Sequence, residues 1–243
     1  GEWHRRVVGV CCDGTGLGDD GSIWGGEIFV GSVAEGFDRV MHLRTVPLPG
    51  GDTSARWPVM AAAGFLSSLA APPEMSVAPV HFPKRYQDAQ TLIQRQVRCF
   101  PTSSLGRLFD TIAALVGFLG ENTFEGQAAV WLEHQARAFE ELAIEPYPLP
   151  IVSETLDVAP LLQAILHDRL NGREPGWIAW AAHLGIAHGL ASAIDQCCQR
   201  FSTDTIVLSG GVFQNDLLLR ALRQATARRL HLWTNRLVPP NDG

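Results

Sequence analysis

Two segments decide the fold: Val7-Val8-Gly9-Val10-Cys11-Cys12-Asp13-Gly14-Thr15-Gly16 and Ile206-Val207-Leu208-Ser209-Gly210-Gly211-Val212-Phe213-Gln214-Asn215. Each is an apolar run that stops at glycines, and such a run predicts a buried strand that leads into a tight turn. The backbone N–H groups of a turn of this kind can face a phosphate. Because the segments are about 200 residues apart, we predict a nucleotide held between two lobes that each supply a strand and a turn.

The first segment also contains a misleading motif. Gly16-Leu17-Gly18-Asp19-Asp20-Gly21 fits the dinucleotide pattern G-x-G-x-x-G, which requires a helix directly afterwards. The residues from Ser22 to Val30 are instead rich in β-branched and aromatic side chains, which favour a strand. Asp19 and Asp20 would also repel a pyrophosphate. We therefore predict a β-hairpin here and not a dinucleotide-binding unit.

Composition limits the class of protein. The 243 residues are 46% hydrophobic and 18% charged, which suits one large domain or two small lobes. A net charge of -6 argues against a nucleic-acid partner, because phosphate neutralisation needs a basic surface. No run approaches the roughly 20 uninterrupted apolar residues of a membrane span, so no membrane is expected. The first residues contain no apolar signal-peptide core.

The cysteines point to a reducing compartment. Cys99 stands alone and the other four form the adjacent pairs Cys11-Cys12 and Cys197-Cys198. This arrangement is neither a disulfide framework nor a C-x-x-C zinc site. We expect a reduced, cytoplasmic protein.

The order of predicted elements gives the fold class. Strands are predicted over 7–13, 23–31, 37–46, 151–152, 205–209 and 230–234. Helices are predicted over 53–70, 86–98, 105–119, 124–142, 158–169, 177–201 and 214–228. This order divides the chain into a strand meander with the first glycine turn (1–52), a mainly helical middle (53–204) and a strand-turn-helix that completes the nucleotide site (205–243). The pattern predicts an α/β fold of the actin/Hsp70-like nucleotidase type with two lobes.

Several segments, in this order, resemble one family. They are Asp13-Gly14-Thr15-Gly16 with Ile23-Trp24-Gly25-Gly26-Glu27, Leu48-Pro49-Gly50-Gly51-Asp52, Pro101-Thr102-Ser103-Ser104 with Gly106-Arg107-Leu108-Phe109-Asp110, Glu125-Gly126-Gln127-Ala128-Ala129, the second glycine segment, and Pro239-Pro240-Asn241-Asp242-Gly243. Together they span the chain. They resemble the C-terminal catalytic module of the HypF carbamoyltransferases, which are hydrogenase maturation factors, and that module is similar to the tRNA threonylcarbamoyladenosine synthase subunit.

The resemblance implies a specific reaction. Carbamoyl phosphate and ATP would give carbamoyl adenylate in a separate adenylate-forming domain. The present module would then transfer the carbamoyl group to the C-terminal cysteine thiol of the partner protein HypE, and AMP would leave. The product would become the cyanide ligand of the NiFe hydrogenase iron.

The resemblance also implies roles for individual residues. Asp13, Gly14 and Thr15 would be catalytic, and the nucleotide would contact Cys12, Asp13, Gly14, Thr15, Gly16, Asp38, Gly51, Gly210, Gly211 and Asn215. Asp242 would hold a divalent metal, either Fe, Zn or Mg, with Asp13 as a second ligand. A metal bound in this way could polarise the carbamoyl carbonyl.

The chain departs from the family pattern in its histidines. The family's metal-binding His-x-x-x-His helix lies upstream of the first glycine turn, and no two of the eight histidines here are four apart. His183 and His188 are five apart, about 140° around a helix, and cannot bind one ion from one face. We interpret both as structural. The chain also stops directly after Asp242-Gly243, so we expect it to be truncated at both ends, with an inactive fragment as one of the alternatives.

Alternative interpretations remain open for single residues and for the function. Asp13 can cap its own turn, Asn215 can be a helix N-cap, Cys12 can be a small buried apolar residue, and Arg107 can either be solvated or steer an anionic adenylate. The rival functions are an antibiotic O-carbamoyltransferase that modifies a hydroxyl, an ATP-dependent sugar kinase or chaperone-like ATPase, and a non-catalytic fragment that retains the fold.

Overall fold

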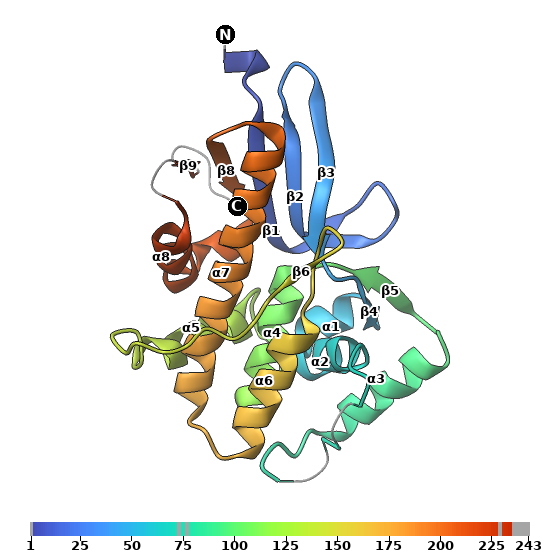
Figure 1. Ribbon diagram of the computed structural model, residues 1–243. Helices are drawn as coiled ribbons and strands as arrows, with labels where there is room; N and C mark the ends of the chain where they lie inside the picture. Colours follow the sequence, from blue (N-terminus) through green and yellow to red (C-terminus); the bar gives the residue numbers. More distant parts are fainter. Residues whose placement is uncertain (1, 72–73, 76–77, 228–229, 235–243) are drawn as a thin grey trace.

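The computed structural model describes residues 2–71, 74–75, 78–227 and 230–234. After a short 3-10 helix, η1 (Glu2–His4), three long strands form an antiparallel meander: β1 (Val7–Leu17), β2 (Ile23–Ser32) and β3 (Gly36–Leu43). Ile28 in β2 lies opposite Val10 of β1 and Met41 of β3. The predicted hairpin is therefore confirmed, and the dinucleotide-binding reading is excluded because a strand follows the glycines (Figure 1).

Strands from the rest of the chain extend this meander on both sides. β8 (Thr205–Ser209) pairs parallel with β1, and β9 (His231–Trp233) pairs parallel with β8. At the opposite edge, β7 (Thr155–Leu156) joins β3, and β6 (Ile151–Val152) joins β7. The order across the described part of the sheet is β6-β7-β3-β2-β1-β8-β9. The late strand-turn-helix thus lies beside the first glycine segment, as the sequence predicts.

The residue pattern does not predict β7 or two further short strands, β4 and β5. β4 (Val46–Pro49) pairs antiparallel with β5 (Cys99–Thr102), and β5 touches β2 where Thr102 lies opposite Ile23. Prolines hide both strands, because proline cannot donate to a ladder and is expected only at edges. Here Pro47 lies directly opposite Pro101, in a branch off the main sheet.

The helices lie at the predicted positions, with bounds that differ by a few residues. They are α1 (Asp52–Arg56), α2 (Pro58–Leu66), α3 (Lys84–Gln94), α4 (Leu105–Val116), α5 (Gln127–Arg137), α6 (Ala159–Leu170), α7 (Pro175–Phe201) and α8 (Asp216–Ala225). The helix predicted over 53–70 is two helices, because Trp57 is extended and Pro58 starts a new helix. The helix predicted from 214 begins at Asp216, after the 3-10 helix η2 (Gly211–Gln214).

The three predicted segments share one sheet and one hydrophobic core. The middle segment supplies β5, β6 and β7 to the sheet, so it is less purely helical than predicted. In Figure 1 the long strands β1, β2 and β3 occupy the upper part of the view, most helices lie below, and α7 runs beside both. α7 is long and apolar enough to cross a membrane by composition, but 78% of its most apolar window is buried inside the protein. It is a core helix in this structure.

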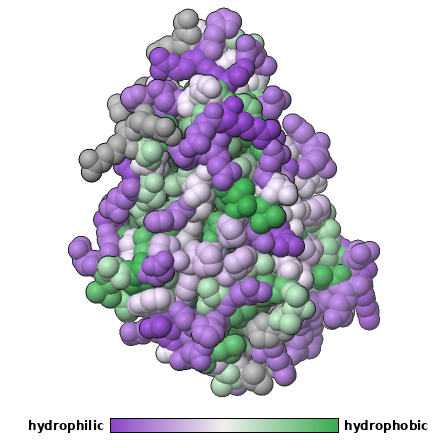
Figure 2. Space-filling view, in the orientation of Figure 1, coloured by the Kyte–Doolittle hydropathy of each residue, from purple (hydrophilic) through white to green (hydrophobic). Residues whose placement is uncertain are grey.

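The two faces of the sheet differ. On β1, Val8, Val10 and Cys12 are fully buried against the helices. The alternate residues Val7, Gly9 and Cys11 line an apolar groove of about 700 Å³ on the other face. Figure 2, in the orientation of Figure 1, shows a mostly polar surface with small, separate apolar groups.

Candidate functional site

The first glycine segment is a bulge inside a strand and not the predicted tight turn. Cys12 lies opposite Gly26 and Gly16 lies opposite Trp24, so Asp13, Gly14 and Thr15 face the single residue Gly25. β1 continues to Leu17, and the hairpin turn itself is closed by Gly18, which bonds to Ser22. A bulge takes residues out of the ladder and re-aims them. The three residues predicted to be catalytic are the ones displaced, and Thr15 is exposed.

Ser104 fastens this bulge to the start of α4. Its hydroxyl lies 2.9 Å from the Asp13 carbonyl oxygen and 2.7 Å from the Gly14 carbonyl oxygen. The same oxygen accepts the Arg107 backbone N–H at 3.1 Å, which caps the helix. The cap segment is visible in the sequence, but its contact with the bulge is not, since the two are about 90 residues apart in the chain.

Two glycines allow this close approach. A Cβ atom on Gly25 would lie 2.3 Å from the Asp13 carbonyl oxygen, and one on Gly106 would lie 2.7 Å from the Gly14 Cα atom. Both distances are too short for any side chain, so glycine is required at each position. The bulge, the β2 glycine and the first turn of α4 therefore form one tightly packed unit.

Arg107 is buried against the same unit. One terminal nitrogen, Nη2, lies 3.3 Å from where a Cβ atom on Gly14 would be. Nη1 lies 2.9 Å from Asp110 Oδ2, but neither Nη1 nor Nε makes an aligned hydrogen bond. Burial raises the pKa of Asp110 to about 6, against the lowering effects of Arg107 and Asn122. Of the two readings left open for Arg107, solvation is wrong, because its side chain is only 6% exposed.

The second glycine segment meets the first through Gly210. Gly210 has φ 103°, and a Cβ atom there would lie 2.1 Å from the Cys12 carbonyl oxygen. The chain then forms η2 and reaches Asn215, whose Oδ1 accepts the Leu218 N–H at 2.9 Å. Asn215 is thus the N-cap of α8, one of the two roles the sequence left open. Its predicted contact with a nucleotide stays a prediction.

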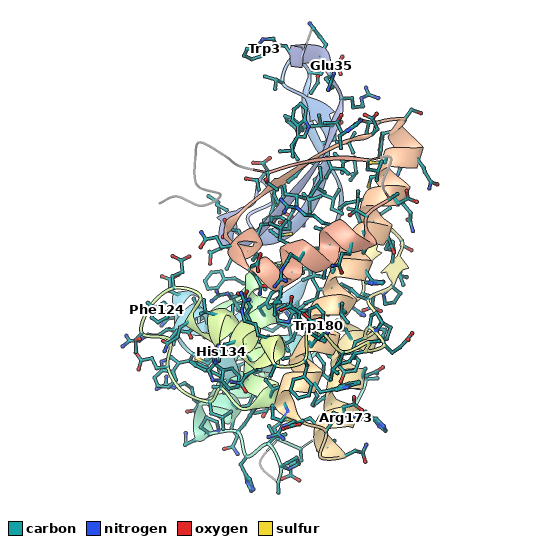
Figure 3. The ribbon with its side chains drawn as sticks, turned by 90° about the vertical axis from the view of Figure 1, so that its left-hand side faces the viewer. Trp3, Glu35, Phe124, His134, Arg173 and Trp180 are labelled. Atoms are coloured by element: carbon teal, nitrogen blue, oxygen red, sulfur yellow. The ribbon has the colours of Figure 1, made fainter. Side chains whose placement is uncertain are left out.

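A cleft of about 200 Å³ lies beside these turns. Its walls come from the start of α4, the start of α5 and the second glycine turn: Gly106, Phe109, Glu125, Gly126, Ala129, Val130, Glu133, Gly211, Val212, Gln214 and Asn215. Gly106 also contacts Gly14, so the cleft adjoins the bulge. In Figure 3, Phe124, next to this wall, lies in the loop before α5, and His134 lies on α5.

The cleft walls carry two carboxylates, Glu125 and Glu133, and none of the lining residues that the structure describes is a lysine, arginine or histidine. Glu125 is exposed, and Glu133 is half-buried beside Arg137, whose Nη2 lies 2.7 Å away. Carboxylates accept hydrogen bonds from hydroxyl and amino groups and repel phosphates. The buried guanidinium of Arg107 is at the other end of this region, next to Gly14.

The cysteines near the bulge are protonated thiols. Burial is the largest cause that raises the pKa of Cys12 well above its ordinary value, with Cys11, Glu27 and Asp13 adding to it. Burial likewise raises the pKa of Cys11. A thiol in this state is a poor nucleophile. Cys12 is therefore a small buried side chain, the interpretation that the sequence favoured.

Two predicted nucleotide contacts lie away from the bulge. Asp38 pairs with Val30, which pairs with Val8, so it lies level with a residue five positions before Asp13. At about 3.3 Å per residue that is roughly 16 Å along the strand. Gly51 follows the end of β4. This strand starts at Val46, which lies beside Thr102, and runs from there away from the α4 cap. The structure does not bring Asp38 or Gly51 to the bulge at residues 13–15.

The predicted metal site cannot be assembled from the part of the chain that the structure describes. Asp242 falls outside the described residues. Within them, no three His, Cys, Asp or Glu side chains converge on one point. Asp13 Oδ1 accepts the Gly14 N–H at 2.7 Å, the turn-capping role considered for it from sequence. His183 is buried and structural, as predicted, with Nδ1 2.7 Å from the Ala179 carbonyl oxygen.

Comparison with known proteins agrees with this geometry. The family model described as "Carbamoyltransferase, Kae1-like Domain, second subdomain" matches residues 9–243. The carbamoyltransferase HypF of Rhodobacter capsulatus is 34% identical over 98% of this chain and 31% of its own length. The crystal structure of full-length HypF in a phosphate- and nucleotide-bound form is 31% identical and has a TM-score of 0.88, over 98% of this chain and 38% of that one.

The solved HypF of T. kodakarensis is also similar, with 28% identity and a TM-score of 0.81 over 95% of this chain and 31% of that one. The chain thus spans about a third of the length of these relatives. Because the family model covers nearly all of the sequence and the fold matches throughout, the chain belongs to the HypF carbamoyltransferase family, as the second subdomain of its Kae1-like domain.

Proposed function

We propose that this chain forms one side of a carbamoyl-transfer site that works on an adenine nucleotide. The observation that carries the proposal is the junction of the two glycine segments, where Gly210 contacts Cys12 and Gly106 contacts Gly14 beside the cleft. Family membership supports carbamoyl transfer in hydrogenase maturation. The nucleotide in the solved full-length HypF supports a nucleotide as ligand.

The charged side chains around the cleft suggest the orientation in which a nucleotide would bind. The ribose hydroxyls and the adenine amino group are donors, which suit the Glu125 and Glu133 carboxylates of the cleft. The phosphate and the carbamoyl oxygen are acceptors, which suit Arg107 beside Gly14. We therefore orient the nucleoside toward α5 and the reacting end toward the bulge.

The reaction proposed at the bulge is transfer from carbamoyl adenylate to the C-terminal cysteine thiol of a HypE-like partner. The thiol would release its proton to water as its sulfur bonds to the carbamoyl carbon, the bond from that carbon to the phosphate oxygen would break, and AMP would leave. The raised pKa values of Cys11 and Cys12 favour direct transfer to the partner over a relay through this chain's own thiols. An adenylate-forming domain would supply the donor, and a divalent metal bound by Asp13 and Asp242 stays a prediction.

Calorimetric titration with AMP and with ATP tests the nucleotide part of the proposal. We expect micromolar binding by the chain. Val130→Trp should fill the cleft, because Val130 lines it, and should weaken binding at least tenfold, or about 1.4 kcal/mol. Val152→Trp, on exposed β6, is the matched control and should bind like wild type. Wild-type binding that Val130→Trp leaves unchanged would show that the nucleotide binds elsewhere.

The chemical step needs its own assay, because binding alone does not distinguish a transferase from a kinase. With carbamoyl adenylate and a peptide that ends in cysteine, we expect a thiocarbamate on the peptide and release of AMP. A kinase would release ADP from ATP. Carbamoylation of a serine-ended peptide at an equal rate would favour the O-carbamoyltransferase alternative.

A further inference from the structure

Glu27 is a buried carboxylate whose hydrogen-bonding capacity is fully used. It is 1% exposed on β2. Its Oε2 atom accepts the backbone N–H groups of Gly25 at 2.5 Å and of Gly26 at 2.7 Å. Its Oε1 atom accepts the Ser103 hydroxyl and Arg39 Nη2, the latter at 3.1 Å. Two consecutive backbone N–H groups form a cradle for an anion, and here the protein's own side chain occupies it.

Two of these donors, Gly25 and Ser103, adjoin the bulge. Gly25 is the residue opposite Asp13, Gly14 and Thr15, and its Cα packs against the Asp13 carbonyl. Ser103 precedes Ser104, whose hydroxyl contacts the carbonyls of Asp13 and Gly14. Glu27 therefore hydrogen-bonds to Gly25 on β2 and to Ser103 before α4, the two segments that flank the bulge, without touching the bulge itself.

The positive partner of Glu27 comes from the neighbouring strand. Arg39 on β3 reaches across to Glu27, and its other terminal nitrogen lies 3.3 Å from Asp20 Oδ2. The guanidinium carbon lies 4.4 Å from the centre of the Trp24 ring, and Trp24 Nε1 donates to Asp20 at 3.0 Å. This arrangement neutralises the buried carboxylate and covers it, which a buried charge requires.

We infer that Glu27 is a positioning residue, which sets the conformation of the 13–15 bulge and through it the alignment of the ligand's reacting end. The part of the inference that concerns ligand alignment rests on the proposed function. The part that concerns the conformation of the bulge does not depend on it. Backbone carbonyls and N–H groups can act on a reacting group only if they are held in place before it binds. Glu27 supplies that restraint from behind the site, through Gly25 and Ser103.

Glu27→Gln tests the inference, because all four partners of the carboxylate are donors. An amide offers one acceptor oxygen and one donor nitrogen. Depending on its orientation, the variant loses either both backbone contacts or the Arg39 contact, because the Ser103 hydroxyl can also accept. Glu35→Gln is the matched control on the same hairpin: Glu35 is exposed, 3.7 Å from Arg6, and lies at the far end of the molecule in Figure 3.

The first readout is the backbone amide resonances of the free protein. We expect Glu27→Gln to shift Gly25 and Gly26, which lose a charged acceptor, and also Asp13, Gly14 and Thr15, which Glu27 does not touch. Glu35→Gln should leave all five unchanged. Unchanged resonances for residues 13–15 in a folded Glu27→Gln protein would overturn the inference, whether or not the chain binds a nucleotide.

The second readout separates positioning from stability. AMP affinity is measured at a temperature where circular dichroism shows each variant fully folded. We expect at least a tenfold loss for Glu27→Gln and none for Glu35→Gln. Equal affinity for wild type and Glu27→Gln would overturn the inference, whereas no binding by wild type would overturn the proposed function and leave the resonance test to decide.

Should Glu27→Gln fail to fold, Ser103→Ala removes only one of the four donors. We then expect smaller shifts of the same five amides and a smaller loss of AMP affinity. Shifts confined to residues near Ser103, with residues 13–15 unmoved, would count against the inference.

Discussion

Asn215 and His183 are joined by a buried contact of 3.0 Å between Asn215 Nδ2 and His183 Nε2. Burial lowers the pKa of His183 to about 4, so the ring is neutral at neutral pH. With its Nδ1 hydrogen directed to the Ala179 carbonyl, Nε2 is left as an acceptor for the Asn215 amide. The amide oxygen of Asn215 is then free to cap α8. The contact ties the second glycine turn to the middle of α7.

Replacing Asn215 should lower the unfolding free energy by more than the loss of an ordinary helix cap does. Asn215→Ala removes the cap, worth about 1 kcal/mol, and leaves His183 Nε2 without its donor, at a further cost of about 1 kcal/mol or more. Asn215→Ser keeps an oxygen for the cap and should lose less. Urea denaturation of the three proteins measures both losses. Equal stabilities of the alanine and serine variants would show that the cap contributes nothing.

His183 should make the protein less stable in acid. The folded pKa of about 4 is below the ordinary 6.5, so the unfolded state binds more protons between these values. Its contribution is present above pH 6.5 and is lost as pH falls toward 4, by at most about 3 kcal/mol. Replacing His183 by Gln should flatten the fall in denaturant midpoint across this window. A fall as steep as in wild type would contradict this assignment.

Asp110 should act with the opposite sign. Burial raises its pKa to about 6, so the folded state binds the extra proton between pH 3.8 and 6. Its contribution to stability falls by at most about 3 kcal/mol as pH rises through that range. Asp110→Asn removes this opposing trend, so stability should then rise more steeply with pH between 4 and 6 than in wild type. Denaturant midpoints at several pH values give the slopes.

Removing Arg107 alone should lower the unfolding free energy more than replacing Arg107 and Asp110 together. Arg107→Met leaves the Asp110 carboxylate buried without its cation and should cost about 3 to 5 kcal/mol in unfolding free energy. The double variant Arg107→Met with Asp110→Asn removes both charges and should recover most of that loss. In the recovered protein, AMP affinity should remain at least tenfold weaker while adenosine affinity is unchanged. Full recovery of AMP binding would show that Arg107 does not face the phosphate.

Gly210 should tolerate no side chain. A Cβ atom there would lie 2.1 Å from the Cys12 carbonyl oxygen, and φ is 103°. Gly36 has a similar positive φ of 87° but no neighbour within 4 Å, which makes Gly36→Ala the matched control for backbone strain. We expect Gly36→Ala to cost about 1 kcal/mol and Gly210→Ala several times more, because β1 and β8 must separate. Similar thermal midpoints for both would refute the close contact.

The residue pattern alone predicts the hairpin, the positions of the helices and the family resemblance. The β-branched and aromatic residues of 23–31 and the helical spacing of apolar residues in 105–119 are local signals that can be read from the residues alone. The glycine segments were also visible, because a glycine where the backbone must approach closely leaves a local mark in the chain. Gly14 and Gly210 were identified in this way.

The structural role of those glycines depends on how the folded chain pairs and packs. A bulge depends on how two strands pair, so nothing in 13–16 alone distinguishes it from a turn. Ser104 and Glu27 act on the bulge through contacts formed after folding, and a burial-lowered pKa at His183 depends on what surrounds the ring. Asp38 lies on β3 opposite Val30, and its place along the sheet follows from the strand register. Pairing, burial and distance are properties of the packed chain, which is why residue pattern alone does not supply them.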